Sequence, residues 1–150
     1  MIIRDILNLK GSALFSIAPS GKVTEAVSIM AANDIGSLVV MENGKMTGMF
    51  TFREVLKALD ARRGNLDELL VANIMTRDPI FGQPGDTLEH LREVMLQHHI
   101  RYLPVQEVDK LLGVISFHDV AKALLRETSM ENRLLRRYIE DLPEPEAPAQ

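Results

Sequence analysis

The sequence predicts an α+β fold made of two tandem β-α-β-β-α repeats, packed as a pseudo-two-fold pair, followed by a C-terminal amphipathic helix. Three observations predict this fold: a self-similarity within the chain, apolar residues at helical spacing, and paired apolar runs joined by short turns. The chain has 150 residues and is 46% hydrophobic. It can therefore bury one continuous core, but not the cores of two large independent domains.

The self-similarity appears when the chain is shifted by 65 residues, which superposes residues 19–59 on residues 84–124 without a gap. Identical residues then meet at Pro19 and Pro84, Met30 and Met95, Gly48 and Gly113, and Phe52 and Phe117. A repeat of this length indicates one supersecondary unit used twice, with the two copies packed on each other. We therefore expect a first repeat over residues 1–64 and a second over residues 65–128.

Each repeat contains the same series of elements. Apolar residues at helical spacing predict helices over residues 22–32 and 87–98, and Thr87 is a suitable N-cap for the second of these. Asn43-Gly44 between two apolar runs predicts a hairpin, because both residues tolerate positive φ. Val108-Asp109 stands at that place in the second repeat. The remaining strands and helices are expected over residues 13–18, 37–41, 46–50 and 52–62, and over residues 78–82, 102–106, 111–116 and 117–127.

Two segments lie outside this pattern. Residues 65–68 have capping-box spacing and predict a short connecting helix that runs into Ile74. Apolar residues at four-residue steps predict an amphipathic helix over residues 129–142. Because an isolated helix of this length is marginal in water, we expect its Leu134 and Tyr138 face to be buried on its own chain or on a dimer mate. The acidic, proline-rich residues 143–150 are expected to be a disordered tail.

The composition excludes several classes of protein. The net charge is −4 and 25% of residues are charged, so neither nucleic acid nor a membrane is an expected partner. The absence of cysteine excludes disulfides, thiolate zinc sites and cysteine nucleophiles. Arg4 and Asp5 interrupt the N-terminal apolar stretch, which argues against a signal peptide, and no run reaches the roughly 18 apolar residues of a membrane span. We expect a soluble, cytoplasmic protein.

One local pattern suggests a binding site. In each repeat a hydroxyl residue ends a strand, and a carboxylate follows three positions later at the start of a helix: Thr51 with Glu54, and Ser116 with Asp119. The free N–H groups of a helix N-terminus favour an anion, and a carboxylate can accept both hydroxyls of a ribose. The same spacing is that of a capping box, which needs no ligand. Arg101 is likewise either a phosphate contact or an exposed surface charge.

These residues together resemble the CBS-domain pair, a repeat named after cystathionine beta-synthase and also found in stand-alone bacterial proteins. The resemblance rests on the Gly48 to Glu54 and Gly113 to Asp119 runs, on Ile74-Met75-Thr76, and on Ile100 to Val105, and it covers about residues 1–140. It implies a regulatory homodimer that binds AMP, ADP, ATP or a related adenosyl compound between its repeats. It also implies that the protein has no resident cofactor and signals to a downstream protein whose identity is unknown.

The resemblance also assigns residues to two pseudo-symmetric clefts. Ser116 and Asp119 would bind ribose and phosphate in one cleft, and Thr51 with Glu54 would do so in the other. Glu54 replaces the usual aspartate and is one methylene longer, so we expect Asp119 to contribute more to binding. The supporting residues would be Ile35, Gly36 and Ile100 around the purine, Arg101 at the phosphate, and Thr76, Asp78, Pro79 and Ile80 closing the first-repeat cleft. His118 is either a further phosphate contact or an exposed helix residue.

No catalytic set is apparent, and we do not expect an enzyme. Ser116 and His118 are two positions apart, which places them on different faces of a helix. His90 and His98 are two helical turns apart, about 11 Å, which is too far for one metal ion, so no metal site is expected. The alternative to a ligand sensor is a structural dimerisation or interaction module whose clefts stay empty and whose C-terminal helix contacts the partner.

Overall fold

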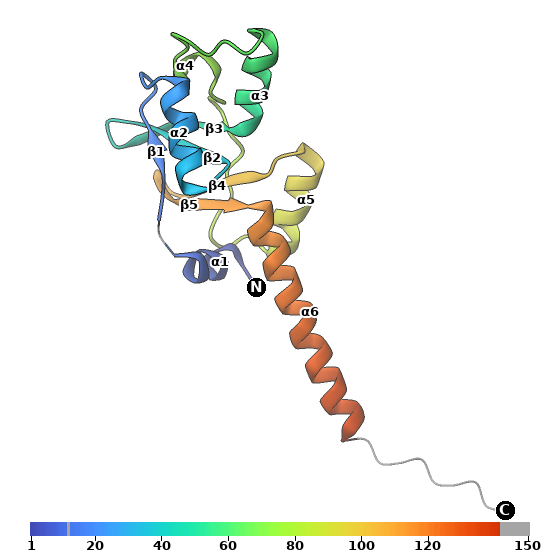
Figure 1. The fold of residues 1–150 in the computed structure, drawn as a ribbon. Helices are drawn as coiled ribbons and strands as arrows, with labels where there is room; N and C mark the ends of the chain where they lie inside the picture. The colour runs from blue at the N-terminus through green and yellow to red at the C-terminus, as the bar shows by residue number, and fades with distance from the viewer. Residues whose placement is uncertain (12, 142–150) are drawn as a thin grey trace, which may run out of the picture.

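The structure is a computed structural model that describes residues 1–11 and 13–141. Two helix-hairpin-helix units follow each other along the chain, so the predicted α+β fold with tandem repeats is confirmed (Figure 1). The helices are α1 (Ile3–Lys10), α2 (Val23–Asn33), α3 (Phe52–Ala61), α4 (Val71–Ile74), α5 (Leu88–His98) and α6 (Phe117–Glu140). The strands are β1 (Ser16–Ile17), β2 (Ser37–Glu42), β3 (Lys45–Thr51), β4 (Tyr102–Glu107) and β5 (Lys110–Ser116).

The two antiparallel hairpins have the same geometry. In the first, β2 pairs with β3, and the register shifts between Val40 and Met41. In the second, β4 pairs with β5, and the register shifts at the equivalent place, between Val105 and Gln106. Bulges at matching positions are specific features of a strand pair, so the repeat in the sequence is also a repeat in backbone geometry.

The two hairpin turns differ in how readily their residues adopt positive φ. Asn43 and Gly44 have φ of 52° and 75°, as the hairpin prediction requires. In the second hairpin Val108 has φ of 54°. A β-branched residue rarely adopts positive φ, so the second turn is strained where the first is not.

The strand predicted over residues 78–82 is wrong except at its last residue. Only Gly82 pairs, in an isolated parallel bridge with Val105. Its counterpart β1 is also shorter than predicted and pairs in parallel with β2. Pro79 lacks a backbone N–H, which removes a donor from the segment that was expected to form a strand.

The connecting helix predicted to begin at Asn65 is also wrong. The Asn65 side chain accepts a hydrogen bond from Asp67 N at 2.9 Å, and Glu68 has φ of 62°. The helix begins only at Val71, as α4. An asparagine side chain that bonds to the backbone two residues later stabilises a turn in competition with a helix, which explains the late start.

Each repeat completes its core with a segment from the other half of the sequence. Val71 and Met75 pack with α2, β2, β3 and α3 in one buried cluster. Ile3 and Ile6 of α1 pack with α5, β4, β5 and α6 in the other. Figure 1 shows α1 beside β5 and α6, which it contacts. α1 was not predicted from the sequence. Its position matters because it brings Lys10 to the second repeat.

The helix that begins at Phe117 does not end at Glu127, as predicted, but continues to Glu140 as one element. α3 ends near Gly64, which has φ of 87°, whereas no glycine or proline interrupts residues 117–141. The separate tail helix is therefore the second half of α6. Leu142 and the expected disordered tail, residues 143–150, lie outside the described residues.

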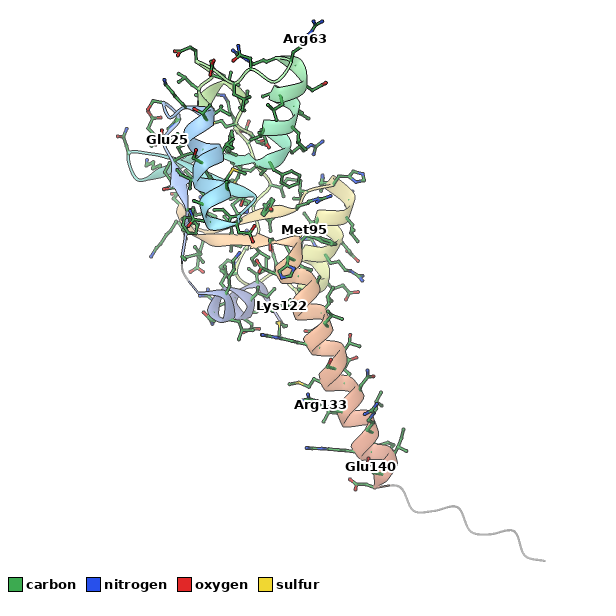
Figure 2. The ribbon with its side chains drawn as sticks, viewed as in Figure 1. Glu25, Arg63, Met95, Lys122, Arg133 and Glu140 are labelled. Atoms are coloured by element: carbon green, nitrogen blue, oxygen red, sulfur yellow. The ribbon has the colours of Figure 1, made fainter. Side chains whose placement is uncertain are left out.

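The second half of α6 extends away from all other elements, and Arg133 and Glu140 lie on it (Figures 1 and 2). Leu134 is 60% exposed and Tyr138 is 66% exposed. Burial of this face on its own chain, one of the two expected arrangements, is therefore wrong for the described chain. Within residues 1–11 and 13–141, no helix combines the length and the hydropathy needed to cross a membrane.

Candidate functional site

Two clefts lie on either side of the connection between α5 and β4. The first, which we name the Ser116 cleft, has a volume of about 1020 Å³. The second, which we name the Thr51 cleft, has a volume of about 940 Å³. His99, Ile100, Arg101 and Tyr102 line both of them. Met95, which is labelled on α5 in Figure 2, lines the Ser116 cleft only. Both volumes are large enough for a nucleotide-sized ligand.

Both hydroxyl-carboxylate motifs form capping boxes. Ser116 Oγ accepts from Asp119 N at 3.1 Å, and Asp119 Oδ2 accepts from Ser116 N at 2.8 Å. Thr51 Oγ1 accepts from Arg53 N at 3.2 Å, and Glu54 Oε2 accepts from Thr51 N at 3.2 Å and from the Thr51 hydroxyl. The capping interpretation therefore holds at both α3 and α6. Each capping box also fixes the orientation of the one carboxylate at the N-terminus of its helix.

The Asp119 carboxylate has a further partner that the sequence did not indicate. Lys10 Nζ donates to Asp119 Oδ2 and to the Val114 carbonyl oxygen, each at 2.7 Å. Burial raises the pKa of Asp119, but hydrogen bonds from Lys10 and Ser116 and the charge of Lys10 outweigh it, so the pKa lies below its ordinary value. Asp119 is therefore a carboxylate that is already neutralised by a lysine from α1.

The equivalent place in the first repeat holds a threonine. Thr76 N donates to Met49 O at 2.8 Å, and Thr76 Oγ1 donates to Glu54 Oε1 at 2.7 Å. Met49 and Glu54 are the counterparts of Val114 and Asp119 under the 65-residue shift. The ammonium group of Lys10 thus makes the two contacts that Thr76 makes in the other repeat. One motif carboxylate faces a cation and the other faces a neutral hydroxyl.

The predicted site residues are divided between the two clefts. Ile35, Gly36, Ser116 and His118 line the Ser116 cleft. Thr51, Glu54, Thr76, Asp78, Pro79 and Ile80 line the Thr51 cleft. Ile100 and Arg101 line both. Asp119 is not among the described residues that line the Ser116 cleft, because its side chain is turned into the contacts with Lys10 and the start of α6.

Two residues that line both clefts, Arg101 and Tyr102, pack against the Phe52 ring. The Arg101 guanidinium lies 5.4 Å from the centre of the Phe52 ring, and Tyr102 meets the same ring edge to face at 6.3 Å. A Cβ atom at Gly36 would overlap the Tyr102 hydroxyl, so any other residue there would displace the Tyr102 side chain. Burial raises the pKa of Tyr102, Arg101 lowers it and Asp119 raises it, with a net rise. Tyr102 therefore remains a protonated hydrogen-bond donor between the clefts.

Several of the residues that line the clefts were not predicted from the sequence. Ala13, Leu14 and Phe15 line the Ser116 cleft in the same way as Asp78, Pro79 and Ile80 line the other. The 65-residue shift relates these two triplets, so extending it beyond Pro19 would have found them. Lys10 could not be found in this way, because the segment before β1 is longer than its counterpart. In the part of the chain that the structure describes, no three histidine or carboxylate side chains are grouped to hold a metal ion.

Comparison with known proteins gives one consistent result. The family model of the CBS domain matches residues 3–61 and 71–126. The CBS domain-containing protein YhcV of Bacillus subtilis is 30% identical over 71% of this chain and 75% of its own length. The crystal structure of the CBS-domain containing protein ATU1752 from Agrobacterium tumefaciens superposes with a TM-score of 0.79 and 31% identity, over 82% of this chain and 98% of that one.

A third similar structure is the CBS domain pair of protein MJ0100, solved in complex with 5-methylthioadenosine and S-adenosyl-L-methionine. It has a TM-score of 0.72 and 23% identity, and covers 85% of this chain and 98% of that one. At this identity the likeness concerns the fold alone. The family match covers both repeats and most of the described residues, so the chain belongs to the CBS-domain family.

Proposed function

We propose that this chain is a regulatory sensor that binds an adenine nucleotide (AMP, ADP or ATP) or a related adenosyl compound in the clefts between its two repeats. The observation that carries the proposal is the Ser116 cleft. It combines apolar walls from both repeats, Ile35 and Ile100, with the entrance of α6 at Ser116 and the guanidinium of Arg101. An apolar slot beside convergent polar groups suits a purine with an attached ribose phosphate.

The residues would act as follows. Ile35, Gly36 and Ile100 would contact the purine ring. Ser116, the backbone N–H groups at the start of α6, Arg101 and His118 would bind phosphate, and Asp119 would bind the ribose after its side chain turns from Lys10 into the cleft. In the Thr51 cleft, Thr51 and Glu54 would take the corresponding roles, with Thr76, Asp78, Pro79 and Ile80 closing the opposite side.

The fold comparison supports the ligand class but does not identify the ligand. A CBS domain pair with the same fold holds two adenosyl compounds in MJ0100. Proteins of one fold can differ in function, so the ligand of this chain has to come from its own clefts. Because both repeats line the Ser116 cleft, a ligand that binds there would change their relative position or the state of a dimer, and a downstream protein would respond to that change.

A second function is favoured by one observation. The apolar face of α6 is exposed along its free half, with Met130, Leu134, Leu135, Tyr138 and Ile139 all uncovered. A continuous apolar stripe on a projecting helix is typical of a protein interface. We propose that it pairs with the same face of a second copy and makes the protein a homodimer, which would serve a sensor and a purely structural module equally well.

The two functions are separated by thermal unfolding of the chain with AMP, ADP, ATP, adenosine and S-adenosylmethionine, and with GTP as the control. A ligand that binds only the folded state raises the melting temperature as its concentration rises. A sensor should respond to at least one adenosine compound and not to GTP. Equal melting temperatures throughout would favour the structural module, and conversion of the added nucleotide would reveal an enzyme.

A further inference from the structure

The ammonium group of Lys10 is a chemical difference between the two pseudo-symmetric clefts. It lines the Ser116 cleft and bonds to Asp119 and Val114, whereas Thr76 occupies the matching place beside Glu54 and Met49. α1 holds Lys10 there, because Ile3 and Ile6 are buried in the core of the second repeat. The lysine is therefore held in place by the fold.

Lys10 retains capacity for a ligand. An ammonium group has three N–H donors, and the structure assigns two of them to Asp119 Oδ2 and Val114 O. The Lys10 side chain is 37% exposed and that of Asp119 is 18% exposed, so the lysine is the more accessible member of the pair. Its neighbours in the cleft include Arg101 and the start of α6, both of which favour negative charge.

We propose that Lys10 is a specificity-determining residue that makes the Ser116 cleft select adenosine compounds carrying phosphate groups over adenosine compounds that are neutral or cationic at the 5′ position. A phosphate in the cleft competes with Asp119 for the ammonium group and gains a charge-assisted hydrogen bond. A sulfonium or uncharged substituent offers no acceptor of this strength and meets the positive charge instead. The inference rests on the proposed binding of adenosine compounds and adds which of them the cleft prefers.

Lys10 also has an effect that opposes ligand binding. By holding the Asp119 carboxylate, Lys10 also removes an acceptor that a ribose could use. If this were its main effect, removing the lysine would strengthen binding of every adenosine compound alike. The two effects are distinguished by the ratio of affinities for phosphorylated and unphosphorylated ligands, and not by either affinity alone.

The test is calorimetric titration with ATP, adenosine and S-adenosylmethionine, using the full chain, Lys10→Thr and Lys10→Arg. Lys10→Thr introduces the residue found in the other repeat, and Lys10→Arg retains the charge. Lys122→Thr is the matched control, because Lys122 is an exposed lysine of α6 that does not itself line either cleft (Figure 2). Circular dichroism checks that each variant is folded.

Lys10→Thr should weaken ATP binding by about tenfold to a hundredfold and leave adenosine binding unchanged or tighter. S-adenosylmethionine should lose less affinity than ATP, because Lys10 repels its sulfonium group although it can donate to its carboxylate. Lys10→Arg should keep the preference of the parent protein, as should Lys122→Thr. An unchanged ratio of ATP to adenosine affinity in Lys10→Thr would overturn the role of Lys10 while leaving the proposed function intact. Failure of all three ligands to bind the parent protein would overturn both.

Discussion

Thr76 donates its hydroxyl to Glu54 Oε1 at 2.7 Å and thereby joins the segment that enters the second repeat to the first turn of α3. The same threonine exchanges two backbone hydrogen bonds with Met49. A carboxylate that is fixed by its own cap and by a neighbouring hydroxyl is held in one orientation beside the Thr51 cleft.

Thr76→Val should lower the free energy of unfolding by about 1 kcal/mol, because it removes a hydrogen bond to a charged acceptor that is partly exposed. Urea unfolding measures the change. Thr24→Val is a suitable control, since Thr24 is an exposed residue of α2. Equal losses in the two variants would show that the Thr76 hydroxyl contributes nothing specific.

The Lys10–Asp119 pair should make stability depend on pH. Burial raises the pKa of Asp119, but Lys10 and Ser116 lower it by more, so the folded protein binds a proton there less readily than the unfolded chain. The stabilisation is complete above the ordinary pKa of about 3.8 and is lost as the pH falls through the lower pKa of the folded state. Asp119→Asn should therefore lose less stability on acidification than the parent protein.

Urea unfolding between about pH 5 and pH 2 measures this difference. Lys10→Thr should also flatten the acid limb, because it removes both a hydrogen bond to Asp119 and the nearby positive charge. Parallel curves for the parent protein and Asp119→Asn would contradict the assigned shift in the pKa.

The turn at Val108 should be a site of easy stabilisation. Val108 is 88% exposed and has φ of 54°, so its side chain contributes no packing while its backbone is strained. Val108→Asn should raise the free energy of unfolding by about 1 kcal/mol. The reciprocal variant Asn43→Val, which introduces the strain in the first hairpin, should lower it by a similar amount. If both variants are as stable as the parent protein, positive φ has no cost in these turns.

The free half of α6 should carry the dimer contact. Leu134→Glu combined with Tyr138→Glu places charges on the exposed apolar face and should convert a dimer into a monomer in sedimentation velocity at micromolar concentration. Deletion of residues 129–150 should have the same effect, and deletion of residues 143–150 alone should not. A parent protein that sediments as a monomer, or a double variant that remains dimeric, would contradict this role.

Local features of the fold could be predicted from the sequence, and features that depend on distant contacts could not. The turn at Asn43 and Gly44 and both capping boxes depend on residues within three positions of each other, and all of them form. The helix predicted from Asn65 does not form although the residues have capping-box spacing, because the side chain of Asn65 caps a turn instead of a helix. Capping residues favour turns and helix starts alike.

The candidate site likewise combines features that could be predicted from the sequence with one that depends on a distant contact. The resemblance named residues that line the two clefts, with Asp119 as the exception, but it did not name others such as Tyr102 and the triplet at Ala13. The lysine that neutralises Asp119 is 109 residues away in sequence and arrives on α1, an element that lies outside the aligned repeat. No local pattern contains that contact, because it depends on how α1 packs against the second repeat.

The most direct test of adenine-nucleotide binding is a calorimetric titration with ATP of variants in which a large side chain fills one of the two clefts. Ala121 lines the Ser116 cleft and Ala61 lines the Thr51 cleft, each from a helix. Ala121→Phe should remove the ATP binding of the Ser116 cleft, and Ala61→Phe should leave it in place, with circular dichroism confirming both folds. If the parent protein takes up no ATP, or if Ala121→Phe binds it as tightly as the parent protein does, the Ser116 cleft is not the nucleotide site.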